Sequence, residues 1–159
     1  MKLIIIFDLD DTLYSRKDFV LNGLRNVSDL IFIRNKNLRK NQVLKDLKNL
    51  YFNSKQKKIF NHYIKIKKIK NIKSKECINA YRYGKNQIKI YPDTRNILYT
   101  YKGKIYLITD GNKNIQRYKI KLLKIKKFFK KIFITNTYGK KYQKPSMFCF
   151  EKIKKIENC

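Results

Sequence analysis

The chain has 159 residues, of which 43% are hydrophobic and 14% aromatic, and a formal net charge of +29. This apolar content argues against disorder, and the length allows one folded domain or one domain with an insert. No apolar run approaches the roughly 20 residues of a membrane span, and the run before Asp8 is too short for a secretory signal. Three cysteines without a CxxC pair fit a reducing compartment. We therefore expect a soluble, cytoplasmic protein with no membrane partner.

The positive charge is carried mainly by lysine and is spread along the whole chain. The chain is also rich in Ile, Asn, Tyr and Phe and has one alanine, Ala80, which is the composition that AT-rich codons produce. Nucleic-acid sites favour arginine for bidentate and stacking contacts, whereas lysine far outnumbers arginine here. We therefore expect no specific nucleic-acid partner, with a functional anionic partner as the alternative. In either case the positive field attracts small anionic substrates.

The first predicted element is a strand over residues 2–7, KLIIIF. A continuous apolar, β-branched run that ends abruptly in acids is typical of a strand buried on both faces of a parallel sheet. Residues 15–87 instead carry apolar residues at helical spacing, which predicts an all-helical insert. In residues 64–72, IKIKKIKNI, alternation and helical spacing both fit. The predicted apolar stripes of the insert are Val20, Leu21, Leu24, Val27, Leu30 and Ile31; Val43, Leu44, Leu47, Leu50 and Tyr51; and Ile59, Phe60, Tyr63 and Ile64.

After the insert, Asp93 is the predicted N-cap of a helix that runs to about Tyr101 and stops at Gly103. Strands are predicted over residues 104–108 and 131–135, with a helix over 113–123 between them, and this order forms a βαβ unit. The last predicted helix covers residues 146–159. The elements together predict an α/β fold: a Rossmann-like parallel sheet core from residues 1–14 and 88–159, with an all-helical insert over 15–87. In such sheets, sites form at the carboxyl ends of the strands.

The strongest chemical signal is FDLDDTL, in which Asp8, Asp10 and Asp11 directly follow the first strand. These carboxylates repel one another, so a cation is expected beside them, and a hard cation such as Mg²⁺ suits oxygen ligands. A solvated acidic turn is the alternative. The segment resembles the first motif of the haloacid dehalogenase (HAD) superfamily, DxDx(T/V). That resemblance implies Asp8 as a nucleophile toward phosphorus, Asp10 as acid and base, Mg²⁺ on the Asp8 carboxylate and the Asp10 carbonyl, and Thr12 bracing the loop.

Two later segments resemble further HAD motifs. Thr109, in LITDGN at the end of the second strand, is similar to the Ser or Thr of the second motif, although TDG is also a common turn. The resemblance implies that Thr109 and the N–H groups that follow it, at Asp110 and Gly111, hold phosphoryl oxygens. Lys144, followed by Pro145, is similar to the third motif, which implies that the lysine neutralises phosphate and nucleophile and that the proline begins the next helix.

The fourth HAD element is a further strand that ends in acids completing the Mg²⁺ site, whereas residues 146–159 predict a helix here. Glu151 and Glu157 lie within that helix and do not take the missing role. The resemblance implies a Mg²⁺-dependent phosphomonoesterase acting on a small phosphorylated metabolite, with the insert as an α-helical cap. A phosphomutase of the same superfamily is one alternative, and a catalytically impaired chain with a binding role is another.

Overall fold

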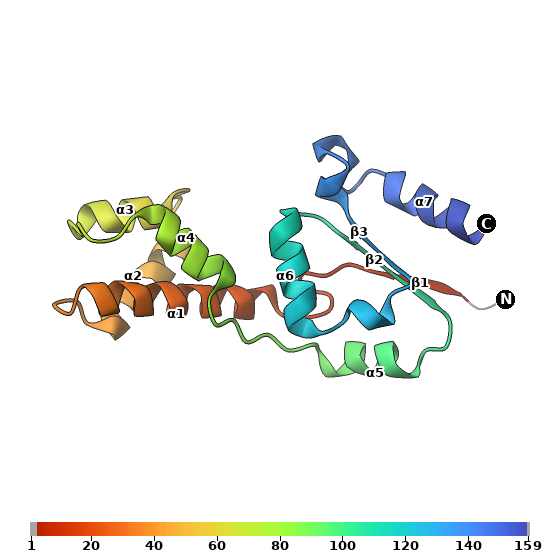
Figure 1. Ribbon diagram of the computed structural model, residues 1–159, viewed down its shortest axis with the longest axis horizontal. Helices are drawn as coiled ribbons and strands as arrows, with labels where there is room; N and C mark the ends of the chain where they lie inside the picture. The colour runs from red at the N-terminus through yellow and green to blue at the C-terminus, as the bar shows by residue number, and fades with distance from the viewer. Residues whose placement is uncertain (1–2, 159) are drawn as a thin grey trace. The chain divides into compact units, whose positions relative to one another are not determined.

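A parallel sheet of three strands forms the centre of one part of the protein (Figure 1), in a computed structural model that describes residues 3–158. In spatial order the strands are β1 (Ile4–Phe7), β2 (Lys104–Thr109) and β3 (Lys131–Ile134). Phe7 lies opposite Leu107, and Thr109 lies opposite Ile134, so the strands end close to one another. The predicted parallel α/β sheet is confirmed. Lys2, the predicted start of the first strand, lies outside the described residues.

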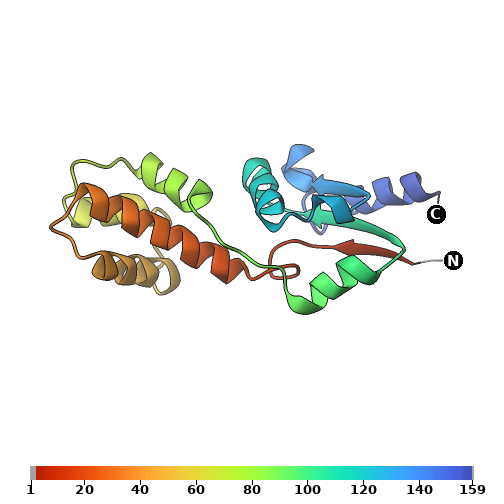
Figure 2. The same cartoon turned by 60° about the horizontal axis from the view of Figure 1, so that its bottom comes forward.

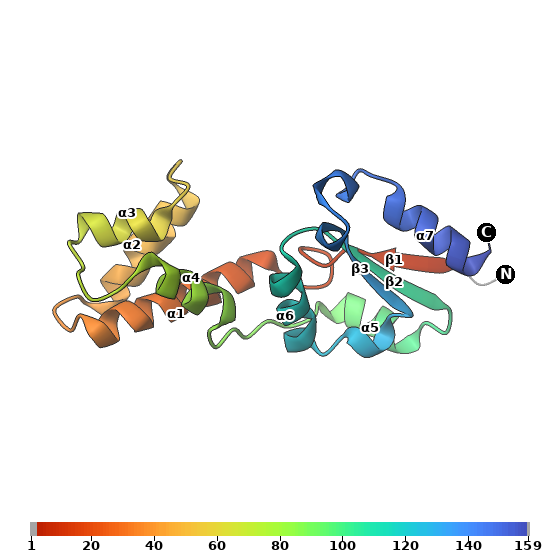
Figure 3. The same ribbon diagram turned by 45° about the horizontal axis from the view of Figure 1, so that its top comes forward.

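Helices cover both faces of this sheet (Figures 1 and 3). Side chains of Tyr106, Ile108 and Phe133 form one buried cluster with Cys149 and Ile153 of the last helix. The opposite face carries buried residues of the other two helices, so β2 is buried on both sides, as its continuous apolar run predicts. These helices are α5 (Pro92–Thr100), α6 (Lys113–Leu123) and α7 (Phe148–Glu157), with short 3₁₀ turns at η1 (Lys126–Phe128), η2 (Thr135–Thr137) and η3 (Lys140–Tyr142).

Residues 1–16 and 88–159 form the compact unit with the sheet. Residues 17–87 form a second compact unit whose regular elements are all helices (Figure 2). Its helices are α1 (Arg16–Arg34), which begins at the junction, α2 (Lys40–Phe52), α3 (Ile59–Ile66) and α4 (Ser74–Tyr83). Leu24, Val27 and Leu47 are fully buried at its centre. In the ambiguous stretch, α3 ends at Ile66, and Ile69 then joins this core from a non-helical segment. The predicted insert began at residue 15.

Helix ends account for the incorrect parts of the predicted fold. Asp93 is not the N-cap of α5, because Pro92 takes the first helical position, where its fixed φ and missing N–H are tolerated, and Tyr91 is the N-cap. That helix ends at Thr100, before Gly103. The last helix begins at Phe148, so the prediction that Pro145 begins it is wrong.

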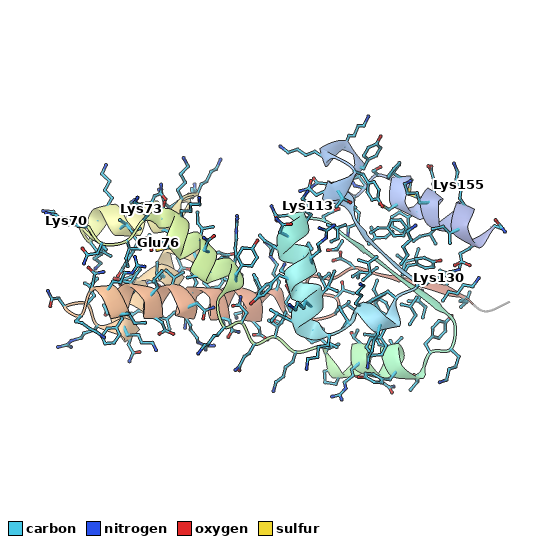
Figure 4. The ribbon with its side chains drawn as sticks, viewed as in Figure 1. Lys70, Lys73, Glu76, Lys113, Lys130 and Lys155 are labelled. Atoms are coloured by element: carbon cyan, nitrogen blue, oxygen red, sulfur yellow. The ribbon has the colours of Figure 1, made fainter. Side chains whose placement is uncertain are left out.

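Lysine side chains come from elements throughout the chain, as the sequence indicated. Figure 4 labels examples: Lys113 begins α6, Lys155 lies in α7, and Lys70 lies between α3 and α4. Within residues 3–158, no helix has both the length and the apolar character needed to cross a membrane.

Candidate active site

The loop that follows β1 carries the predicted acidic residues at the carboxyl edge of the sheet. Leu9 and Leu13 are fully buried, and the Leu13 N–H donates to the Leu9 carbonyl at 3.0 Å, so the two leucines anchor the loop. Asp11 adopts a left-handed conformation with φ of 60°, and its carboxylate accepts the Arg16 N–H at 2.8 Å. This acid therefore serves the first turn of α1. Asp8 and Asp10 are left for chemistry.

Thr12 joins this loop to α5 through its main chain. The Thr94 hydroxyl donates to the Thr12 carbonyl at 3.2 Å, and the Tyr91 N–H donates to the Leu13 carbonyl at 2.9 Å. The loop is thus fixed to the segment that re-enters the sheet unit, which holds the acids in place.

Lys144 meets Asp8 although the two residues are separated by 136 positions in the chain. The Lys144 Nζ lies 2.6 Å from the Asp8 Oδ1, and each side chain is about one third exposed, at 33% and 34%. A lysine at this distance offsets the negative charge of the carboxylate, and partial exposure leaves the pair accessible to a ligand.

Asp10 accepts hydrogen bonds from three side chains. Lys119 Nζ lies 2.6 Å from Oδ1, Gln116 Nε2 lies 2.8 Å from Oδ2, and the Tyr14 hydroxyl also donates to Oδ1. Burial alone raises the pKa of the Asp10 carboxyl, but the Lys119, Tyr14 and Gln116 hydrogen bonds and the lysine charge outweigh it, so the pKa is lowered. Burial, together with the bond to Asp10, raises the pKa of Tyr14. The ionised form of Asp10 is therefore favoured.

Gln116 and Lys119 are functional candidates that the sequence analysis missed. They lie one turn apart on α6, and both are buried. The buried residues of this helix are Gln116, Lys119, Ile120 and Leu123, whereas the apolar Ile115 and Tyr118 are only partly buried. The sequence feature that could have identified them is a pair of polar residues three positions apart, on one side of the helix that directly follows TDG. That helix begins at the edge of the sheet where the acids lie.

The second predicted motif is linked to both acids. Thr109 is fully buried, and its hydroxyl accepts Gln116 Nε2 at 2.7 Å, so the glutamine connects it to Asp10. The Asp110 Oδ1 accepts the Thr135 hydroxyl at 2.5 Å and the Lys144 N–H at 3.3 Å. Gly111 has φ of 111°, a conformation that favours glycine. The structure thus brings the predicted residues together through a chain of hydrogen bonds.

A family model of haloacid dehalogenase-like hydrolases matches residues 5–159 of this sequence. The chain belongs to the haloacid dehalogenase-like hydrolase family. No curated protein matches the sequence.

Solved structures of HAD proteins share this fold at low sequence identity. A candidate β-phosphoglucomutase from Thermotoga maritima has 15% identity and a TM-score of 0.66, and the match covers 98% of this chain and 71% of that one. YfnB of Bacillus subtilis, a candidate HAD hydrolase bound to magnesium, has 18% identity and a TM-score of 0.59, covering 94% and 70%. A HAD-like family hydrolase from Xanthomonas campestris has 16% identity and a TM-score of 0.48, covering 85% and 64%. The present chain thus spans less than two thirds of the length of the Xanthomonas campestris protein.

The oxygen donors of the acidic loop fit a hard cation in part. Three donors occupy the Asp10 carboxylate, so its main-chain carbonyl is the better metal ligand, and the half-buried Asp8 carboxylate is the second. Both are the oxygen type that Mg²⁺ prefers. Across the described part of the chain, residues 3–158, no three His, Cys, Asp or Glu side chains are grouped to hold a metal ion. In this HAD-like hydrolase, the Asp8 carboxylate and the Asp10 carbonyl are the groups that would hold the ion.

Proposed function

We propose that this HAD-like hydrolase is a Mg²⁺-dependent phosphomonoesterase that acts on a small phosphorylated metabolite through an aspartyl phosphate. The observation that carries the proposal is the Asp8–Lys144 pair, with Lys144 Nζ 2.6 Å from the Asp8 carboxylate and Asp10 two residues further on. A carboxylate beside a lysine ammonium can receive a phosphate dianion, because the ammonium offsets the repulsion between the two anions.

In the first step, an Asp8 oxygen attacks phosphorus and the bond from phosphorus to the ester oxygen breaks. Asp10 gives its proton to the departing oxygen, which leaves as an alcohol. The hydrogen bonds from Tyr14, Gln116 and Lys119 stabilise the carboxylate that remains. Because these bonds lower the pKa of Asp10, the first step proceeds from its minor protonated form, which is the stronger acid.

In the second step, Asp10 takes a proton from a water molecule that attacks the phosphorus of the aspartyl phosphate. The bond between phosphorus and the Asp8 oxygen breaks, which releases inorganic phosphate and regenerates the free Asp8 carboxylate. The same three hydrogen bonds keep Asp10 ionised between the steps, which is the state that a base requires.

We assign the phosphoryl oxygens to the Lys144 ammonium and to the main-chain N–H groups of Asp110 and Gly111. The Thr109 hydroxyl is fully buried and bonded to Gln116, so in this proposal it supports the loop from below. Asp110 accepts the Lys144 N–H and thereby fixes the lysine to the phosphate loop.

The Asp8 carboxylate and the Asp10 carbonyl are the proposed Mg²⁺ ligands. When bound, Mg²⁺ would neutralise charge on the phosphoryl group and orient it. Magnesium bound to YfnB supports this choice of ion. We also propose that the helical unit, residues 17–87, is a cap that contributes to substrate choice.

Turnover of p-nitrophenyl phosphate, measured with Mg²⁺ and with EDTA, tests the proposal. Asp8→Asn is expected to abolish turnover, because the amide has a similar shape but is not a nucleophile. Asp11→Asn is the matched control: this neighbouring carboxylate serves the Arg16 N–H, so its loss should change turnover only a few-fold. Turnover by Asp8→Asn above a trace, no turnover by the unsubstituted chain, or undiminished turnover in EDTA would contradict the proposal.

A phosphomutase is the second candidate, supported by the Thermotoga maritima relative. A mutase returns the phosphoryl group from Asp8 to a substrate oxygen. Phosphorus NMR of sugar phosphates incubated with the protein separates the two: free phosphate indicates the hydrolase, and a positional isomer indicates the mutase.

A further inference from the structure

A cavity of about 820 Å³ lies between α5, the end of α6 and η1, and the proposed reaction does not use it. Ligand sites typically measure roughly 300–1,000 Å³, so this volume is adequate for a small ligand. Residues of the sheet unit line the cavity, and Asp8, Asp10 and Lys144 are not among them. The lining includes two aromatic and four basic residues: Tyr99, Phe128, Lys89, Arg95, Lys124 and Lys127.

The two aromatic rings form a fixed platform at this cavity. Tyr99 and Phe128 meet edge to face, with ring centroids 4.7 Å apart and planes at 62° (the helix and turn that carry them lie beside each other in Figures 1 and 3). Tyr99 is 54% exposed, while Phe128 is half-buried and holds it from one side. An exposed ring that is already fixed loses little entropy when a flat aromatic ligand stacks on it.

Basic groups flank these rings. The Arg95 Cζ lies 5.7 Å from the Tyr99 centroid, and Lys127 Nζ lies 5.6 Å from the same centroid and 5.1 Å from that of Phe128. No acidic residue lines the cavity, and over the range 3–158 neither these two cations nor Lys89 and Lys124 form a salt bridge. Such a set is complementary to an anion that also presents a flat ring.

We propose that this cavity binds a nucleoside phosphate, either free or as part of a single strand. The base stacks on Tyr99, and Lys124, Lys127 and Arg95 hold the phosphate. Positive charge alone would not support this assignment on a chain of net charge +29. The assignment depends on the coincidence, around one cavity, of an exposed ring that contacts a second ring and of cations that form no salt bridge within residues 3–158. The apolar side chains of Ile90, Leu122 and Leu123 are also in the lining.

Binding of three probes at about 150 mM salt tests this proposal: AMP, inorganic phosphate and a fluorescently labelled oligoadenylate of 12 nucleotides. Calorimetry reports the first two and fluorescence anisotropy the third, and all are measured on the Asp8→Asn chain so that nothing is hydrolysed. We expect AMP or the strand to bind more tightly than inorganic phosphate. Binding of AMP itself assigns a free nucleotide, and binding of the strand alone assigns single-stranded nucleic acid.

The aromatic variants identify the site. Tyr99→Ala is expected to weaken binding roughly 5- to 100-fold, the effect of one lost base stack, and Tyr99→Phe should retain most of the affinity. Tyr83→Ala is the matched control, because Tyr83 is also exposed, at 43%, but belongs to the other unit. It should leave the affinity unchanged.

The charge variants separate this site from general attraction. Lys124→Ala/Lys127→Ala should weaken strand binding and lower the slope of log affinity against log salt by about 1–2. Lys45→Ala/Lys48→Ala removes the same charge from a cavity lined without aromatic residues and should lose clearly less. The proposal is overturned if neither AMP nor the strand binds more tightly than inorganic phosphate, if Tyr99→Ala binds normally, or if both lysine pairs lose equally.

Discussion

Replacement of Lys119 by methionine removes a buried cation from Asp10 and keeps a side chain of similar length. The Lys119 side chain is 9% exposed, and its Nζ lies 2.6 Å from the Asp10 Oδ1. Loss of one partner from a buried ion pair typically costs about 3–5 kcal/mol. Asp10 is 24% exposed and retains the donors from Tyr14 and Gln116, so we expect a smaller loss, about 2–3 kcal/mol of unfolding free energy near neutral pH.

The pH dependence of this loss has a defined sign. In the unsubstituted chain the pKa of Asp10 is lowered, so its ionised form contributes stability that is present above the unfolded-state pKa, near 3.9, and is lost as pH falls through the folded-state value. Without Lys119, burial is opposed only by Tyr14 and Gln116, and the pKa rises. Protonation then relieves the unpaired charge. The difference in stability between the two chains should therefore narrow as pH falls through the Asp10 pKa of the variant toward the lowered Asp10 pKa of the unsubstituted chain.

Urea denaturation followed by circular dichroism measures both expectations. Lys121→Met is the matched control, because it makes the same substitution on the same helix at an exposed position. It should change stability by less than about 0.5 kcal/mol. If Lys119→Met were as stable as Lys121→Met at pH 7, or if its deficit stayed constant on acidification, the ion-pair argument would be refuted.

The remaining predictions concern catalysis, the sheet core and a second carboxylate. Lys144→Met is expected to lower kcat/KM for an aryl phosphate by about 10²- to 10³-fold, with Lys141→Met as the exposed control; equal rates for the two variants would contradict the role of Lys144. Leu107→Ala, at a fully buried position in β2, should lower the unfolding free energy by about 2–5 kcal/mol in urea titrations. Hydrogen bonds from Lys104, Tyr106 and Lys130 lower the pKa of Glu157 to about 2, so this group stabilises the fold above its unfolded pKa, and that contribution disappears as pH falls toward 2. Glu157→Gln should therefore show a shallower loss of stability in acid than the unsubstituted chain, and a curve of identical slope would argue against this.

The sheet, its helices and the two leading acids could be predicted because their signals are local. A continuous apolar run that ends in acids identifies β1 and places Asp8 and Asp10 at its end without knowledge of any other residue. The predicted helix over 113–123 matches α6 for the same reason, since polar and apolar residues alternate at helical spacing within it. Lys144 was selected among many lysines through its adjacent proline and the preceding strand.

What the sequence did not provide is the direction in which each helix faces. Gln116 and Lys119 look like solvent-facing residues of an amphipathic helix, and only the packing of α6 on the sheet buries them against Asp10. The start of α7 was misplaced for a related reason. Its first helical hydrogen bond joins the Glu151 N–H to the Met147 carbonyl. Just before it, the Ser146 N–H donates to the Gln143 carbonyl in a turn.

These same contacts place cations of the chain beside the acidic cluster. Repulsion among Asp8, Asp10 and Asp11 required a cation, and the structure supplies two, because Lys144 lies on Asp8 and Lys119 on Asp10. The Asp11 carboxylate accepts the Arg16 N–H at the start of α1. Two of the three acids are therefore paired with a cation of the chain itself, and repulsion alone no longer requires Mg²⁺. The reason to propose Mg²⁺ is instead the phosphate that arrives with the substrate. Without a metal ion, Lys144 would have to offset the negative charge of both this phosphate and Asp8.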